Sequence, residues 1–408
     1  MAQLPKGEPA PADGLIPVAF DSSESSFHAY VHVPYCLTRC GYCDFNTYTA
    51  SELGGHSRTE YFQHVINEIS FSKQVLSNSK VSSRQLSSVF FGGGTPTLLE
   101  PKDLVAILES LRDSFGLLAN AEITTEANPD SVDREYLETL RTAGFTRISF
   151  GMQSAVPKVL EILERTHNPE NVAKNVAIAK QLGFETSVDL IYGTPGETLS
   201  DWEESLSVAI SLETDHISAY SLIVEPGTKL HRQIKSGEVS QPDENLHADM
   251  YLLAEQMLSA AGFMNYEVSN WARGEAVRSK HNVAYWQSKD WWGYGPGAHS
   301  HIAGVRWWNV KHPAAYAERV TQSISPALER EIVDLDNRKV EKVMLEGRLC
   351  EGMDLNWLKE QGFANPEVIS SLIAEELVDA QKIFAGRLVL TLKGRLLADL
   401  VVRKLLGF

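Results

Sequence analysis

The sequence predicts an α/β protein whose first part is an incomplete (β/α)6 TIM-like barrel. Segments typical of strands and of helices alternate six times between residues 27 and 223, and the alternation stops after Glu225-Pro226-Gly227. Such crossovers are right-handed, so the strands should run parallel. Polar and glycine-rich residues follow the first five strands, at the end of a barrel where active sites gather. Six units instead of eight predict a laterally open barrel, and a doubly wound open sheet is the alternative.

The predicted elements of the barrel are regularly spaced. Strands are expected at residues 27–33, 88–91, 122–127, 147–151, 186–192 and 216–223. Helices are expected at residues 60–76, 103–115, 131–143, 157–165, 169–182 and 199–212. In the first helix, Phe62, Val65, Ile66 and Ile69 recur at helical spacing, and Pro34 ends the first strand.

Composition divides the chain into four regions. We expect a flexible N-terminal tail at 1–25, the barrel at 26–235, an aromatic- and glycine-rich extension at 236–335 and a C-terminal domain at 336–408. The extension opens with a long helix at 244–261. In the C-terminal domain, helices are expected at 339–349, 357–361, 366–376 and 396–406, with a hairpin at 378–392. Helices followed by a hairpin resemble a winged helix.

Composition and charge limit the classes of function. Of the 408 residues, 43% are hydrophobic and 22% are charged, as in ordinary globular proteins. The net charge of −16 would repel a polyanion, and the candidate recognition stretch 366–376 is itself acidic, so no nucleic-acid partner is expected. No apolar run has the length of a membrane span, and the N-terminus lacks the apolar core of a signal peptide. We therefore expect a cytoplasmic protein with at most peripheral membrane contact.

The stretch after the first strand carries three of the four cysteines. Cys36, Cys40 and Cys43 are spaced as C-x-x-x-C-x-x-C, whereas Cys350 lies far away and is expected to be a small buried hydrophobe. Clustered thiolates favour an iron–sulfur cluster, zinc or copper(I). A structural zinc site takes four ligands, usually as two knuckles, and the sequence has no second knuckle. Iron–sulfur clusters also usually take four cysteines, so three would leave one iron open to a small molecule.

This spacing resembles that of the radical S-adenosylmethionine (SAM) enzymes. In that family the three cysteines hold a 4Fe-4S cluster, and its open iron chelates the amino and carboxylate groups of SAM. The aromatic residue before the last cysteine, Tyr42, is also a feature of the family. The resemblance implies a laterally open barrel, a 4Fe-4S cluster, SAM and an electron donor for the cluster. The cofactor would supply the chemistry, and the protein would bind, orient and shield it.

A glycine-rich segment follows the second predicted strand. Gly92-Gly93-Gly94-Thr95-Pro96 lacks the G-K-[ST] ending of a phosphate loop, and it resembles the family segment whose backbone contacts the methionine amino group. The resemblance to the coproporphyrinogen oxidase branch implies a wider set of SAM contacts, namely Tyr30, Gly93, Gly94, Thr95, Glu126, Gln153, Arg165 and Asp189. Glu126, Gln153 and Asp189 lie at or near strand ends, where they could hold ribose hydroxyls or the amino-acid end. Arg165 could instead be a solvated surface arginine.

One residue departs from the oxidase pattern. The resemblance covers nearly all of the chain after residue 26, but oxygen-independent coproporphyrinogen III oxidases have a fourth cysteine where this chain has Phe45. A phenylalanine at this place is typical of the related heme chaperones. The substitution therefore disfavours decarboxylation of coproporphyrinogen.

A second motif favours the heme chaperones. The segment His281-Asn-Val-Ala-Tyr-Trp286 is similar to their H-N-x-x-Y-W heme-binding motif. Imidazole is a common axial ligand of heme iron, and aromatic rings can stack on a macrocycle, so His281 is the leading candidate ligand. A lone histidine among aromatic residues can equally serve packing or hydrogen bonding. Five nearby residues are either rival ligands or ordinary core, namely Trp291, Trp292, Tyr294, His299 and His301.

Together these features predict a heme chaperone of the radical SAM family. It would bind heme and transfer it to apo-hemoproteins. The alternative is an oxygen-independent coproporphyrinogen III oxidase, which forms protoporphyrinogen IX in porphyrin biosynthesis. A nucleic-acid regulator acting through the C-terminal domain is a third, weaker hypothesis, which the acidic charge disfavours.

Overall fold

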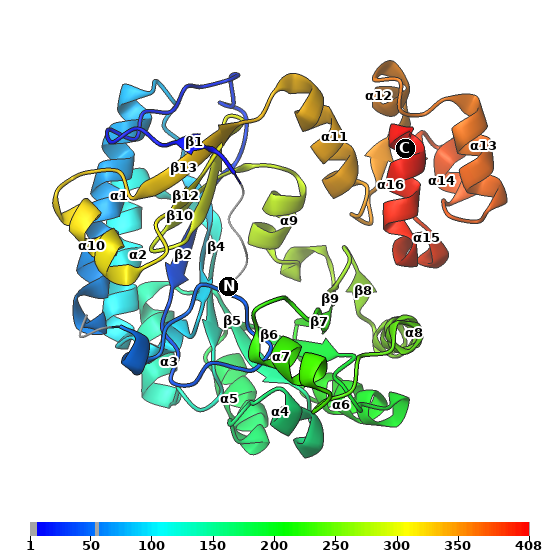
Figure 1. Ribbon diagram of the computed structural model, residues 1–408, viewed down its shortest axis with the longest axis horizontal. Coiled ribbons are helices and arrows are strands. Elements are labelled where there is room, and N and C mark those ends of the chain that lie inside the picture. The colour runs from blue at the N-terminus through cyan, green and yellow to red at the C-terminus, as the bar shows by residue number, and fades with distance from the viewer. Residues whose placement is uncertain (1–5, 54–56, 408) are drawn as a thin grey trace.

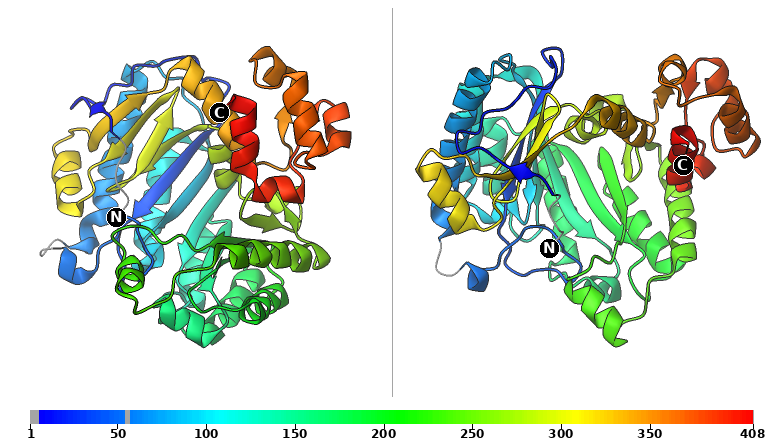
Figure 2. Two further views of the ribbon diagram at one scale, coloured as in Figure 1. Left: turned by 45° about the vertical axis from the view of Figure 1, so that its right-hand side comes forward. Right: turned by 45° about the horizontal axis from the view of Figure 1, so that its top comes forward.

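The computed structural model describes residues 6–53 and 57–407, and it contains the parallel sheet that the sequence predicts (Figure 1). Six strands lie in chain order, and each pairs in parallel with the next. They are β2 (Phe27–Val33), β3 (Leu86–Gly93), β4 (Leu117–Ala127), β5 (Arg147–Gln153), β6 (Glu185–Tyr192) and β7 (His216–Ser221). The outer two, β2 and β7, pair with further strands and not with each other. The sheet curves into a laterally open half-barrel, so the expected fold class is confirmed (Figure 2).

Helices cover the convex face of this sheet (Figures 1 and 2). They are α1 (Tyr61–Asn78), α2 (Pro101–Phe115), α3 (Arg134–Ala143), α4 (Pro157–Ile162), α5 (Pro169–Gln181) and α6 (Leu199–Ser211). All six lie close to their predicted positions. Helix α3 begins at Arg134 and not at Ser131, because the side chain of Asp133 caps it by accepting a hydrogen bond from the Tyr136 amide at 2.9 Å. Within the described ranges, no helix is long and apolar enough to span a bilayer.

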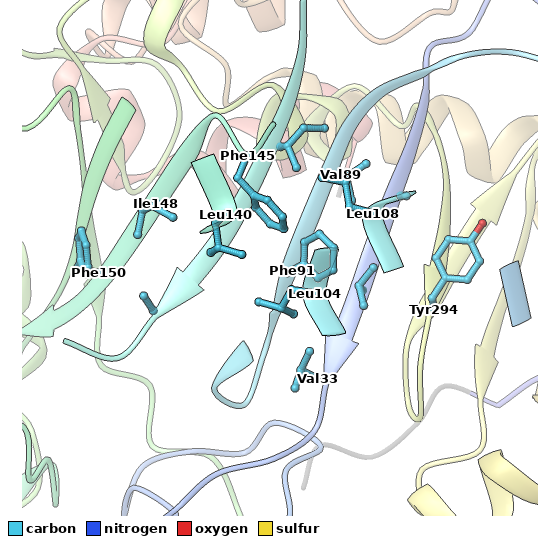
Figure 3. Packing of buried hydrophobic residues seen from close by; sticks show 14 of the residues in the cluster. Val33, Val89, Phe91, Leu104, Leu108, Leu140, Phe145, Ile148, Phe150 and Tyr294 are labelled. Carbon is cyan, nitrogen blue, oxygen red and sulfur yellow. The ribbon is translucent and has the colours of Figure 1, made fainter. Parts of the chain in front are cut away.

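The main hydrophobic core lies between the strands and these helices. Figure 3 shows Val33, Val89 and Phe91 of the strands near Leu104 and Leu108 of α2. Successive residues of a strand point to opposite faces, so the apolar residues of each strand face the helices. The residues between them face the concave side, and most of those are polar.

The extension continues the same sheet. Strand β10 (Asp290–Tyr294) pairs in parallel with β2, and three antiparallel strands follow it outward. Its remaining elements are α8 (Glu244–Ala260), β8 (Met264–Asn265), β9 (Asn270–Ala272), α9 (Lys280–Trp286), β11 (His299–Ile302), β12 (Val305–Asn309), α10 (Pro313–Thr321) and β13 (Ala327–Ile332), and α7 (Lys229–Ser236) precedes them. Residues of the extension belong to the same hydrophobic core as the barrel. The boundary expected at residue 235 therefore does not separate two packing units.

The N-terminal segment differs from the expected flexible tail. Within residues 6–25, strand β1 (Glu8–Pro9) pairs with β13, and Ile16 is buried. The hydroxyl of Ser22 donates to the carboxylate of Asp290 at 2.6 Å. The flexibility expected from composition is overridden here because this segment covers the edge of the sheet. Residues 1–5 of the expected tail lie outside the described residues.

The C-terminal domain has a hydrophobic core of its own. Its elements are α11 (Leu335–Glu346), β14 (Met353–Asp354), α12 (Leu355–Glu360), α13 (Pro366–Ala374), α14 (Ala380–Phe384), β15 (Arg387–Leu388), α15 (Leu392–Leu396) and α16 (Ala398–Leu406). Of the hairpin expected at 378–392, only an antiparallel bridge between Val378 and Leu390 is present, and the two-residue strand β15 pairs with β14 instead. Asp379 caps a short helix in that place by accepting from the amides of Gln381 and Lys382.

Polar contacts join the C-terminal domain to the rest of the chain beside α8 (Figure 1). Arg395 forms an ion pair with Glu255 of α8 at 2.9 Å. Arg278, just before α9, pairs with Glu351. The Cys350 amide donates to the Tyr266 carbonyl at 3.0 Å. These contacts place the domain at the side of the barrel where the concave face opens.

A buried carboxylate ties the barrel to the extension. Glu68 of α1 is fully buried, and it accepts hydrogen bonds from the Tyr316 hydroxyl at 2.6 Å, the Gly295 amide at 2.8 Å and the Asn309 side chain at 2.9 Å. Burial raises its pKa to about 7, although these donors act in the opposite direction. The folded state therefore holds a proton on Glu68 that the unfolded chain releases at lower pH.

This shift gives the first prediction. Because the folded pKa of Glu68 is raised above its unfolded value, its protonation stabilises the fold fully below about pH 4.5 and the contribution disappears as the pH rises through about 7. The loss should amount to roughly 3 kcal/mol. Gln at position 68 cannot titrate, so only wild type should lose this stability. In denaturant titrations of wild type and Glu68→Gln, the unfolding free energy of wild type minus that of the variant should therefore fall from pH 4.5 to pH 7. A difference that does not depend on pH would contradict the assignment.

Candidate functional site

The concave side of the sheet encloses a cavity of about 880 Å³. Each of the six parallel strands contributes inward-facing residues, for example Tyr30, Phe90, Glu126, Ser149, Asp189 and Ser218. The cysteine loop lines the cavity at the carboxyl ends of the strands, and α9 lines it further down. Pockets for small molecules usually measure roughly 300–1,000 Å³, so this cavity is large enough for a cofactor and more.

The three clustered cysteines line this cavity together. Burial raises the pKa of Cys36 to about 11 and raises that of Cys43, so both thiols hold their protons unless positive charge compensates. Arg165 brings such a charge, because its Nη1 lies 3.7 Å from the sulfur of Cys40. In the described residues no three His, Cys, Asp or Glu side chains converge on a site for a single metal ion. A four-iron cluster is bulkier than one ion, so its thiolate ligands need not converge so closely.

The cysteine loop is held against the opposite side of the barrel. The aromatic ring of Tyr42 packs beside a small apolar cluster that includes Leu163 and Leu222. The Gly41 carbonyl accepts a hydrogen bond from the Leu230 amide of α7 at 2.9 Å. The loop that begins after β2 therefore reaches across the top of the sheet to elements that follow β5, β6 and β7. Tyr42 lines the cavity, and its packing fixes the last two cysteines in place.

The glycine segment at the end of β3 lies too close to its neighbours for any side chain. A Cβ on Gly94 would lie 2.6 Å from the Tyr35 carbonyl oxygen. A Cβ on Gly93 would lie 2.6 Å from the ring of His32, and the φ of Gly93 is +110°, which L-residues rarely adopt. The Thr95 hydroxyl points toward the sulfur of Cys36 at 3.9 Å. This segment presents bare backbone to the cavity directly beside the cysteines.

Two carboxyl groups face the cavity from β4 and β6, on either side of β5. Burial and the charge of Asp189 raise the pKa of Glu126 to about 8, and Glu126 accepts a hydrogen bond from the Gly93 amide at 3.3 Å. Burial also raises the pKa of Asp189, which the Ser149 hydroxyl contacts at 2.9 Å. Two enclosed carboxyl groups whose charged forms are disfavoured by burial form a site that favours a positively charged ligand.

Arg165 and Gln153 border the same space. Arg165 donates to the Gly151 carbonyl at 3.0 Å, and its Nε is buried without a partner. Its alternative interpretation as a solvated surface residue is therefore wrong. Gln153 has a φ of +64°, an uncommon conformation that occurs often at functional sites. Tyr30 lies deeper, where its hydroxyl bonds the His32 ring at 3.0 Å. The structure thus brings the expected SAM contacts to the cavity that the cysteines line.

His281 lies on α9 at the inner end of the cavity, and its surroundings differ from those of a free ligand. It is only 2% exposed. Its Nδ1 bonds the Ser88 hydroxyl at 2.7 Å, and its Nε2 bonds the Tyr285 hydroxyl at 2.9 Å. The ring of Phe90 stacks on it at 5.2 Å between centroids. Burial holds the pKa of His281 well below its usual value, so the ring is neutral. As placed here, neither ring nitrogen is free to bind iron.

The five residues considered beside His281 do not line the cavity. Trp292 and Tyr294 belong to the hydrophobic core on the convex face. His301 donates to the Lys289 carbonyl at 3.0 Å, and His299 stacks on Trp308. Of these five residues, Trp292 and Tyr294 fit the interpretation as ordinary core.

The sequence did not reveal several polar residues on the inner face of the sheet, of which Arg147 and His216 line the cavity. Glu122 caps α9 by accepting from the Lys280 and His281 amides at 3.0 and 3.1 Å. Arg147 lies 3.4 Å from Glu122, and the ring of His216 bonds the Tyr266 hydroxyl at 2.9 Å. They could have been found from the alternation of side chains along each strand, because every second residue faces the same side of the sheet. Glu122 and Arg147 share the inner face with Glu126 and Ser149.

The residues present fit a 4Fe-4S cluster with SAM. Three thiols meet on one cavity beside an arginine, and glycine backbone lies next to them. Two enclosed carboxyl groups are available to the cationic part of such a ligand. The Arg165 Nε and the Thr124 hydroxyl, both buried without partners, are available to its polar groups. The donor set is therefore consistent with the cofactor that the cysteine spacing predicts.

Comparison with known proteins agrees with this geometry. The model of the radical SAM superfamily matches residues 30–209. The chain is 46% identical over 384 residues to the heme chaperone HemW of Mycobacterium tuberculosis, a match that covers 93% of this chain and 95% of the relative. It is 33% identical to HemW of Bacillus subtilis, covering 93% and 99%. The solved structure of the coproporphyrinogen III oxidase HemN of Escherichia coli has the same fold, with a TM-score of 0.78, 23% identity and coverage of 93% of this chain and 90% of that chain.

The fold and the cysteine site thus define a radical SAM protein. Within that superfamily the chain belongs to the family of the heme chaperone HemW.

The second prediction concerns the cluster. After anaerobic reconstitution the protein should contain about four irons per chain. Replacing Cys36, Cys40 or Cys43 with alanine should abolish this iron content, because each thiol lines the cavity. Cys350→Ala is the matched control, since Cys350 lies in a turn of the C-terminal domain beside Arg278. Iron and sulfide analysis decides the matter, and loss of iron in the control would refute the three-cysteine assignment.

Proposed function

We propose that this protein binds heme and transfers it to apo-hemoproteins in the cytoplasm. One observation carries the proposal. Two relatives that the chain matches over 93% of its length, at 46% and 33% identity, are named heme chaperones. The cavity supports a role that depends on a cofactor, because the cysteine loop and the polar residues of the strands line the same cavity.

The chain's own residues would hold the cofactor in a fixed place. Cys36, Cys40 and Cys43 would bind the cluster, with Arg165 beside Cys40 favouring the thiolate form. The backbone of Gly93 and Gly94 would receive the amino-acid end of SAM. Glu126 and Asp189 would ionise next to a cationic ligand and hold its polar groups. When bound and reduced by an electron donor, such a cluster can supply an electron to the sulfonium of SAM.

An oxygen-independent coproporphyrinogen III oxidase is the second candidate. Its support is the shared fold with HemN, and at 23% identity that likeness concerns the fold alone. Phe45 stands where the resemblance places a fourth cysteine in the oxidases. Its phenyl ring cannot bind iron, donate a proton or take part in radical chemistry as a thiol can. We therefore favour the chaperone.

The third prediction separates the two functions. Reconstituted protein should bind heme tightly in absorption titrations. With SAM and a competent reductant it should not convert coproporphyrinogen III to protoporphyrinogen IX in an anaerobic assay. Conversion at many turnovers would move the protein to the oxidase class, and absence of heme binding would reject the chaperone function.

The fourth prediction concerns the axial ligand. Binding of iron by His281 requires it to give up its hydrogen bond to Tyr285 or to Ser88. If this exchange occurs, His281→Ala should weaken heme binding and shift the heme absorption band while the iron–sulfur content stays unchanged. His301→Ala is the matched control, because His301 is a buried imidazole of the same extension that does not line the cavity. An unchanged band in His281→Ala would exclude His281 as the ligand.

A further inference from the structure

Three large apolar side chains at the mouth of the cavity are exposed to solvent. Leu37 is 76% exposed, Phe45 is 58% exposed and Ile223 is 68% exposed, and all three line the cavity. Single apolar side chains on a surface need no explanation, but several around one opening mark a binding site. We refer to these three residues as the apolar rim.

The rim comes from two parts of the chain that the fold brings together. Leu37 directly follows Cys36 and Phe45 lies two residues after Cys43 in the loop after β2, and Ile223 follows β7. These are the first and last of the six parallel strands. The hydrogen bond between Gly41 and Leu230 joins the cysteine loop to α7, just beyond Ile223. The rim therefore spans the opening from both sides.

The rim suits a flat apolar ligand better than a polar one. An aromatic ring such as that of Phe45 can stack offset on a macrocycle, and the aliphatic side chains of Leu37 and Ile223 can cover its face. The deeper candidate contact, His281, is enclosed and has both ring nitrogens occupied. A large ligand entering the cavity meets the rim before it can reach that histidine.

Charge makes apolar contact the main source of affinity. Heme carries two propionates, and the chain has a net charge of −16. Long-range attraction therefore does not favour the ligand, and burial of its apolar face must supply the binding free energy.

We propose that the apolar rim is where heme is captured, with Phe45 stacking on the macrocycle. This inference rests on the proposed heme-binding function, and it identifies the residues that heme contacts first. It also gives Phe45 a role of its own beyond the loss of a thiol. The contact is made by the porphyrin face and does not depend on which side chain binds the iron.

The test compares rim variants with a control variant in heme titrations of the reconstituted full-length protein. Phe45→Ala and Ile223→Ala should each weaken heme binding about tenfold, as expected for removing most of an apolar contact. The matched control is Phe384→Ala, because Phe384 is 89% exposed on the C-terminal domain and does not line the cavity. Iron content is measured in every variant.

The outcomes distinguish the two proposals. Heme binding by wild type that is unchanged in both rim variants overturns the rim and leaves the chaperone function standing. Absence of heme binding by wild type rejects the proposed function itself. Ile223 lies outside the cysteine loop, so weaker heme binding in Ile223→Ala with full iron content supports the rim even if Phe45→Ala disturbs the cluster. An equal loss in Phe384→Ala would overturn the inference, since the effect would then not be specific to the cavity.

Discussion

The cavity of this protein depends on the alternation of apolar and polar residues along its parallel strands. Strands of parallel sheets are usually apolar on both faces, because helices or other layers cover each side. Here the convex face is apolar and packs against helices, while the concave face carries His, Glu, Arg, Ser and Asp side chains. Polar groups at this depth must be paired, and most of them are. The polar face does not collapse into a packed interior, and a cavity remains beneath the cysteine loop.

Much of the barrel could be predicted because its signals are local. Apolar periodicity placed the six strands and their covering helices, and the cysteine and glycine motifs each occupy a few consecutive residues. The parts that the sequence predicted wrongly or left open depend on contacts between distant segments. The packing of residues 6–25 requires β13, more than three hundred residues away. The environment of His281 requires Ser88, from a strand far earlier in the chain. No pattern within a short stretch of the sequence identifies β13 or Ser88 as the partner.

Tyr266 links the C-terminal domain to the inner end of the cavity. Its carbonyl accepts a hydrogen bond from Cys350, and its hydroxyl bonds His216, which lines the cavity. A shift of the C-terminal domain would therefore act on Tyr266, which also holds His216 in the wall of the cavity. The contacts of this domain with the rest of the chain suit a structural brace, and a fold alone does not imply nucleic-acid binding.

The position of β2 in the sheet has a consequence for how the chain is made. Tyr30 pairs with Phe90 on one side and with Gly293 on the other. During synthesis from the N-terminus, one edge of β2 stays unpaired until residues 290–294 have left the ribosome. Contacts between such distant residues form slowly, and open strand edges invite association with other chains. The strand that leads into the cysteine loop is thus completed late, so insertion of a cluster into its finished surroundings has to follow translation of most of the chain.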